Sequence, residues 1–138
     1  MNNRKHGRIW GTLLLLAASA LCAGCGSNNT VESFIPEELT SREALEKALT
    51  AWKSGQSDPG TLAGGKPKIQ VADQRWLQGD KLLNFEIGEP LDEEGPPQFT
   101  VKLTLEGASE PITETYVVVG KDPLWVYTKS EYERSAGM

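Results

Sequence analysis

Histidine and cysteine are almost absent from this chain of 138 residues. The single histidine is His6 and the two cysteines are Cys22 and Cys25, so residues 26 to 138 contain neither an imidazole nor a thiol. Catalytic Cys-His and Ser-His-Asp arrangements, and zinc sites built from cysteine and histidine, are therefore excluded from that part of the chain. A disulfide is excluded there as well, so its fold must be held together by a hydrophobic core.

The chain also lacks an apolar run that is long enough to span a bilayer. The longest run, Ile9 to Leu21, has 13 residues, whereas a transmembrane helix needs roughly 20. Three cationic residues precede the run, namely Arg4, Lys5 and Arg8, and small residues follow it. A cationic start, a short apolar stretch and small residues before a cut site predict a secretory signal sequence.

The end of this segment reads Leu21-Cys22-Ala23-Gly24-Cys25. It resembles the lipobox of bacterial lipoprotein precursors, in which the signal peptidase cuts before a cysteine that is acylated and becomes the new N-terminus. The family prefers leucine three positions before that cysteine, a position held here by Cys22. A cut before Cys22 would place the bulky Leu21 where the peptidase prefers Gly, Ala or Ser. The resemblance therefore implies cleavage between Gly24 and Cys25, with the lipid attached to Cys25.

Removal of the first 24 residues leaves a mature chain of 114 residues that would be exported and anchored in the cell envelope by its acyl chains. An Asp directly after the lipidated cysteine would resemble an inner-membrane retention signal. That position is Gly26 here, so an outer membrane is favoured if the cell has one. The mature chain keeps 11 Lys and Arg residues against 19 Asp and Glu, a net charge of −8. Because no basic run remains, we do not expect nucleic acid as a partner, and the excess of acid favours solubility.

The composition of the mature chain divides it into three parts. Residues 25 to 39 are rich in Ser, Asn and Thr near their start and predict a flexible tether, in which Phe34 and Ile35 could dock on the domain. Residues 40 to 130 predict an α+β domain, and residues 131 to 138 a tail. Fifteen flexible residues would reach roughly 20 Å, enough for the domain to clear the lipid headgroups.

Residues 40 to 55 carry the clearest helical pattern. Thr40 and Glu43 are spaced as a capping box, and Gly55 stands where a left-handed C-cap would end the helix. The spacing of the apolar residues predicts one buried stripe, with Trp52 as a core residue or, alternatively, a platform for ligand stacking. The stripe consists of Leu45, Ala48, Leu49 and Trp52.

From residue 69 onward the apolar period changes to two, which predicts strands. The predicted strands are Ile69 to Val71, Lys81 to Ile87 with Leu83, Phe85 and Ile87 on one face, Phe99 to Leu105, Ile112 to Val119 and Leu124 to Thr128. Alternation from Phe99 to Leu105 indicates an antiparallel strand with one wet face. Asp73 opens the sequence Asp-Gln-Arg-Trp and predicts the cap of a single helical turn that places Trp76 against the core.

The loop from Glu89 to Pro97 carries four acidic residues, Glu89, Asp92, Glu93 and Glu94. A cation-binding loop is conceivable, but the ordered spacing and turn glycine of an EF-hand are missing. A solvated hairpin tip is the better interpretation, and we expect neither a metal nor a cofactor.

One helix followed by four to five mostly antiparallel strands, with no alternation of strand and helix, predicts an amphipathic helix packed on a curved sheet. The pattern, with Ala-Trp-Lys-Ser-Gly at 51 to 55, resembles the cystatin-like and NTF2-like domains, and the whole is similar to short lipoproteins of planctomycete-type bacteria. These resemblances imply a binding or interaction module for an envelope protein or a small ligand. The alternatives are a small enzyme with a cavity between helix and sheet, and a structural or assembly factor of the envelope.

The candidates for residues that line such a cavity are Asp73, Trp76 and Tyr116. The acid-base groups available to an enzyme are carboxyls and phenols, of which Asp73, Glu86 and Tyr116 are the candidates. Each also has an ordinary structural interpretation: Asp73 as a cap, Glu86 on a wet strand face, and Tyr116 in the core with its hydroxyl at the rim. A carboxyl group that points into an enclosed apolar cavity would favour the enzyme, because burial raises a carboxyl pKa.

Overall fold

The computed structural model describes residues 34 to 138. The predicted signal sequence, the cut between Gly24 and Cys25, and the lipid attachment site at Cys25 lie outside this range. The described part contains three helices and five strands: α1 (Glu38–Lys53), β1 (Ile69–Ala72), α2 (Gln74–Leu77), β2 (Leu82–Pro90), β3 (Gln98–Leu105), β4 (Ile112–Gly120), β5 (Leu124–Thr128) and α3 (Lys129–Ser135). None of these helices is long and apolar enough to cross a membrane.

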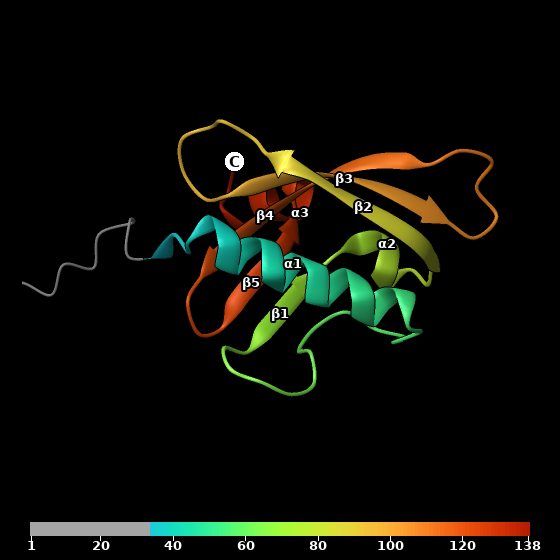
Figure 1. Cartoon of the computed structure of the whole chain (residues 1–138), viewed down its shortest axis with the longest axis horizontal. Helices are drawn as coiled ribbons and strands as arrows, with labels where there is room; N and C mark the ends of the chain where they lie inside the picture. The colour runs from blue at the N-terminus through green and yellow to red at the C-terminus, as the bar shows by residue number, and fades with distance from the viewer. Residues whose placement is uncertain (1–33) are drawn as a thin grey trace, which may run out of the picture.

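The five strands form one open sheet in the order β1-β5-β4-β3-β2 (Figure 1). Strands β2, β3, β4 and β5 pair with one another in antiparallel fashion, and β1 pairs with β5 in parallel, with Val71 opposite Val126. The predicted α+β class with a mostly antiparallel sheet is therefore confirmed. The outer edge of β1 is covered by the loop before it, where Thr61 bridges Gln70.

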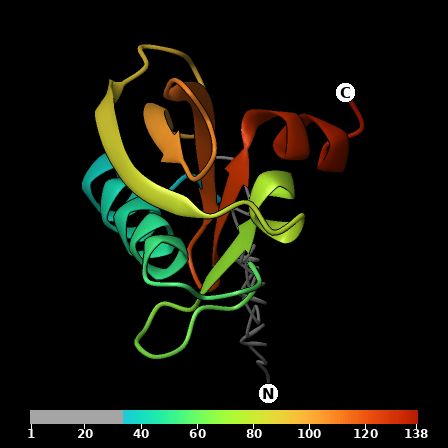
Figure 2. The same ribbon diagram turned by 90° about the vertical axis from the view of Figure 1, so that its right-hand side faces the viewer.

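Helix α1 lies on one face of the sheet and α3 on the opposite side, with the strands between them (Figure 2). Alternate residues of the strands face α1, so Phe99, Val101 and Leu103 of β3 are fully buried, as the sequence predicted. The core between α1 and the sheet holds these residues together with Leu45, Leu49, Trp52, Trp76, Tyr116, Val118, Leu124 and Val126. Because this layer is packed with side chains, we look for a functional site on the surface and at the strand ends.

Helix α1 begins two residues before the predicted start, so the predicted capping box is wrong. Glu37 is the extended N-cap residue and makes no side-chain capping bond, while Thr40 lies inside the first turn. A hydroxyl inside the helix cannot serve as the N-cap acceptor, and Ser41 instead donates its hydroxyl to the Glu37 carbonyl at 2.8 Å. The segment predicted as a tether, residues 25 to 39, therefore overlaps the first two residues of α1.

The other end of α1 follows the predicted geometry. Gly55 has φ +99°, its amide donates to the Trp52 carbonyl, and the amide of Gln56 donates to the Ala51 carbonyl. This pair of bonds is a Schellman motif, which needs a residue in the left-handed region and so favours glycine. Arg42 fixes the helix to the sheet, since its guanidinium donates to the Ile87 and Gly88 carbonyls at 3.0 and 2.8 Å.

Strand β2 differs from its predicted facing at its start. The pairing with β3 shifts between Leu82 and Asn84, so one residue is unpaired there. As a result Leu82 is buried and Leu83 is 52% exposed. The prediction that Leu83 faces the core is wrong, because a bulge moves the alternation by one residue. Phe85 and Ile87 pack against the core as predicted.

Helix α3 occupies most of the segment predicted as a tail. Its N-cap is Thr128, whose hydroxyl accepts from the Glu131 amide at 3.4 Å. Tyr132 packs on Tyr127, which in turn stacks on Trp125 on the face of the sheet away from α1. A domain boundary at residue 130 is therefore wrong, since the last helix begins one residue earlier and packs on the sheet.

Candidate functional site

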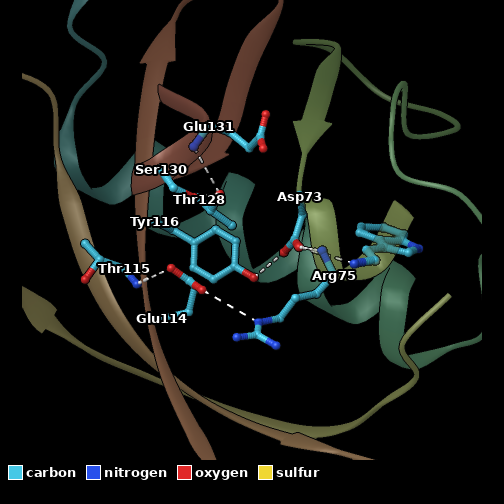
Figure 3. Close-up of polar contacts among 9 residues, drawn as sticks. Asp73, Arg75, Glu114, Thr115, Tyr116, Thr128, Ser130 and Glu131 are labelled. Atoms are coloured by element: carbon cyan, nitrogen blue, oxygen red, sulfur yellow. Dashed lines mark hydrogen bonds and ion pairs between the residues drawn. The ribbon is translucent and has the colours of Figure 1, made fainter. Parts of the chain in front are cut away.

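The three cavity candidates from the sequence, Asp73, Trp76 and Tyr116, gather at one end of the sheet. Because β1 and β5 are parallel, their carboxyl ends lie side by side, with Ala72 opposite Tyr127. Asp73 follows the first of these strands and Thr128 ends the second, so the starts of α2 and α3 are neighbours. Tyr116 of β4 is the partner of Thr128 in the next pairing. Figure 3 shows the side chains that this arrangement brings together.

Asp73 is the centre of the buried polar contacts. One carboxyl oxygen, Oδ1, accepts from the backbone amides of Arg75 and Trp76 at 2.9 and 3.3 Å, which confirms the predicted cap. The other oxygen, Oδ2, accepts from the hydroxyl of Tyr116 at 2.5 Å (Figure 3). With only 3% of Asp73 exposed, both oxygens are occupied by hydrogen bonds that join α2 to β4.

Tyr116 is 1% exposed, so the prediction that its hydroxyl reaches the rim is wrong. Burial, followed by the nearby carboxyl of Asp73, raises the pKa of Tyr116 well above its usual value of 10.0. Removing the phenolic proton would place a second negative charge beside Asp73 in a dry environment, which is unfavourable. Tyr116 therefore acts as a neutral hydrogen-bond donor and not as a general base.

Trp76 completes the junction between α2 and α1. Its ring stacks on Trp52 with centroids 5.5 Å apart and planes within 7°. The indole nitrogen of Trp76 donates to the Gln56 carbonyl at 2.8 Å, and that of Trp52 donates to the Asp80 carbonyl at 2.7 Å. Both rings are almost fully buried, at 1% and 3% exposed, which confirms Trp52 as core and leaves neither face open for a ligand.

A shallow polar cleft of about 330 Å³ opens next to this junction, between α2, β4 and α3. It is lined by Asp73, Gln74, Arg75, Gln78, Glu114, Thr128, Ser130, Glu131 and Arg134. Two ion pairs lie in the cleft: Arg75 Nε is 3.9 Å from Glu114 Oε2, and Arg134 Nη1 donates to Glu131 Oε1 at 2.7 Å. We call these lining residues the polar cleft.

Glu114 is an acidic residue of the polar cleft whose pKa is shifted by its surroundings. Burial raises its pKa above the usual 4.5, the hydrogen bond from the Thr115 amide lowers it, the charge of Asp73 raises it and that of Arg75 lowers it. Its side chain is 24% exposed, so it still reaches solvent. A partly buried carboxylate at the cleft wall is suited to receiving a positively charged group, because it has little water to lose.

The sequence prediction missed most of the polar cleft. Arg75, Glu114, Glu131 and Arg134 are single charged residues on three separate elements, and only the parallel pairing of β1 with β5 brings these elements together. The Thr-Lys-Ser-Glu order at 128 to 131 is the one signal that could have indicated a helix start.

Glu86 does not join the site. It lies on exposed β2 and pairs with Lys102 of β3 at 3.8 Å, with 73% of its side chain exposed. This position matches the wet strand face that the sequence predicted and does not suit an acid-base group in a cavity. Among residues 34 to 138, no three acidic or metal-binding side chains are arranged to hold a metal ion.

A larger hollow of about 520 Å³ lies elsewhere, between α1 and the loop before β1. Its walls are partly apolar, from Ala51, Leu62 and Ile69, and carry Glu43, Glu46 and Lys47 around them. None of the three cavity candidates predicted from the sequence lines it. Of these three candidates, Asp73 lines the polar cleft, and Trp76 and Tyr116 line neither hollow.

The chemistry available in the polar cleft is recognition by charge and hydrogen bonding. Its carboxylates, its guanidiniums and the hydroxyl of Ser130 can hold a small polar ligand. Comparisons of the chain with protein-family models, with curated proteins and with solved structures find no match.

Proposed function

We propose that this protein is a lipid-anchored lipoprotein of the bacterial cell envelope, whose small cystatin-like or NTF2-like domain is a non-enzymatic binding module. The signal at residues 4 to 25 supports export and acylation, and the packing of one long helix on a sheet supports the domain type. The module would bind its ligand in the polar cleft. An outer-membrane location is part of the proposal, for a cell that has one.

One observation carries the choice of a binding module over an enzyme. Both oxygens of Asp73 already accept hydrogen bonds from the protein, and its partner Tyr116 is a buried neutral donor. A general base needs a lone pair that a substrate proton can reach, and only 3% of Asp73 is exposed. The two acid-base candidates that the structure brings together are therefore engaged in holding α2 on β4.

The position of α1 sets how far the module could lie from the membrane. The chain from Cys25 to the start of α1 at Glu38 includes 12 intervening residues. If they behave as a flexible linker, their root-mean-square span is about 20 Å. The domain would then work close to the headgroups, and its acidic surface would keep it from lying flat on anionic lipid.

The anchor is tested by labelling cells that express the chain with a radioactive or clickable fatty acid. We expect label in the parent and in Cys22→Ser, and none in Cys25→Ser, because Cys25 is the thiol that receives the lipid. The Cys22→Ser variant is the matched control, since it changes the other cysteine three residues away. Incorporation of label into Cys25→Ser, or loss of label from Cys22→Ser, would show that Cys25 is not the lipid attachment site.

A further inference from the structure

The charges of the polar cleft are layered. Side chains of Glu114 and Glu131 are only 24% and 18% exposed, whereas those of Arg75 and Arg134 are 47% and 68% exposed. The carboxylates therefore line the inner part of the cleft, and the guanidiniums reach out toward its rim. Asp73 adds a third negative charge to this inner part, although its oxygens already accept hydrogen bonds from Tyr116 and from two backbone amides.

The ion pairs within the polar cleft leave most of its hydrogen-bonding capacity unused. A guanidinium has five N–H donors. Among the described residues, Arg134 uses one of them on Glu131, and Arg75 stands 3.9 Å from Glu114, which is beyond hydrogen-bond distance. Exposed ion pairs of this kind add little to stability, so a ligand that competes with them loses little.

The carboxylates of Asp73, Glu114 and Glu131 make the inner part of the polar cleft negative, and the guanidiniums of its two arginines make the rim positive. A ligand that carries both charges satisfies both layers at once. Resting on the proposed binding function, we propose that the polar cleft binds a small dipolar molecule, with its ammonium group toward Glu114 and Glu131 and its carboxylate toward Arg75 and Arg134. The ligand class is an α-amino acid or a short peptide with free ends, and about 330 Å³ accommodates either.

Each part of this ligand meets the group that chemistry favours for it. Ammonium-carboxylate and guanidinium-carboxylate hydrogen bonds are charge-assisted, and a guanidinium can grip a carboxylate through two parallel bonds. The hydroxyl of Ser130 supplies a further donor and acceptor on the same wall, whereas Thr128 is only 4% exposed and its hydroxyl caps α3. A ligand whose amino or carboxyl end is blocked should therefore lose one of the two sets of charged contacts and bind more weakly.

The test is isothermal titration calorimetry on the mature chain in detergent micelles, with glycine, diglycine and triglycine as probes. N-acetylglycine and glycinamide, each lacking one charge, are the blocked controls. We expect saturable binding of at least one free-ended probe, and binding of the blocked probes at least about tenfold weaker, because each lost charged contact costs about that factor. Tightest binding of glycine would identify an amino acid as the ligand, and tightest binding of the longer probes a peptide.

Variants assign the binding to the polar cleft. Arg134→Gln and Glu114→Gln should each weaken binding about tenfold, whereas Lys102→Gln, an exposed member of an ion pair on the sheet, should leave it unchanged. Arg134 is well exposed, so its replacement leaves the fold intact even if Glu114→Gln alters the melt. Absence of saturable heat with all three free-ended probes, or equal binding of the blocked probes, overturns the inference. Fatty-acid labelling at Cys25 tests the anchor separately, so the two failures are distinguishable.

Discussion

Asp73→Ala is expected to lower the free energy of unfolding by about 1.5 to 5 kcal/mol. The change removes the acceptor for the Arg75 and Trp76 amides, and loss of such a cap costs about 0.5 to 2 kcal/mol. It also leaves the buried hydroxyl of Tyr116 without a partner, which costs about 1 to 3 kcal/mol more. Equilibrium urea unfolding followed by tryptophan fluorescence measures the change, since Trp76 lies at this junction.

Two controls separate the cap from the buried pair. Asp73→Asn keeps an oxygen for the α2 amides and a polar group beside Tyr116, so we expect it to cost less than half as much as Asp73→Ala. Tyr116→Phe keeps the cap and removes only the hydroxyl that donates to Oδ2. If Asp73→Ala unfolds at the same urea concentration as the parent, Asp73 does not stabilise the fold. Asp73 would then again be a candidate for an acid-base group.

Leu49→Ala is the second large effect, expected to cost about 2 to 5 kcal/mol. Leu49 is 2% exposed on the face of α1 that packs on the sheet, so its truncation loses transfer free energy and leaves a cavity. A domain of this size has about 5 to 10 kcal/mol of stability in total, so one substitution could remove half of it. A thermal melt followed by far-UV circular dichroism measures the loss.

The matched control for the helix is Lys47→Ala, two residues away on the exposed side. Its side chain is not in the core, so the melt should superimpose on that of the parent. A Leu49→Ala melt that also superimposes would mean that this stripe of α1 contributes nothing to folding. The stripe would then be a surface for a partner and not a packed core.

The elements that could be predicted from sequence are those with local signals. Alternation from Phe99 to Leu105 and the cap at Asp73 depend on neighbours in the chain, and both agree with the structure. The bulge at Leu83 could not be predicted, because it reflects the pairing of β2 with β3 and not the order of residues in β2. The predicted start of α1 is wrong because Thr40 and Glu43 have the spacing of a capping box, whereas the helix begins at Glu38 without one.

The polar cleft could be predicted only in part for a related reason. Asp73 and Tyr116 were recognised as the candidates, but their mutual hydrogen bond joins residues 43 positions apart. Arg75 and Glu114 meet because β1 lies parallel to β5, a pairing for which the sequence carries no turn or alternation signal. Charged residues that are spaced without a motif become a site only when the topology is known.

Mass spectrometry of the intact protein from the membrane fraction of an expressing bacterium shows whether the domain is anchored through a lipid. We expect a chain of 114 residues that begins at Cys25 and carries the added mass of its acyl groups. A chain that keeps residues before Cys25, or one that begins at Cys25 with no added mass, would contradict the anchor. The domain would then have to be explained without a membrane.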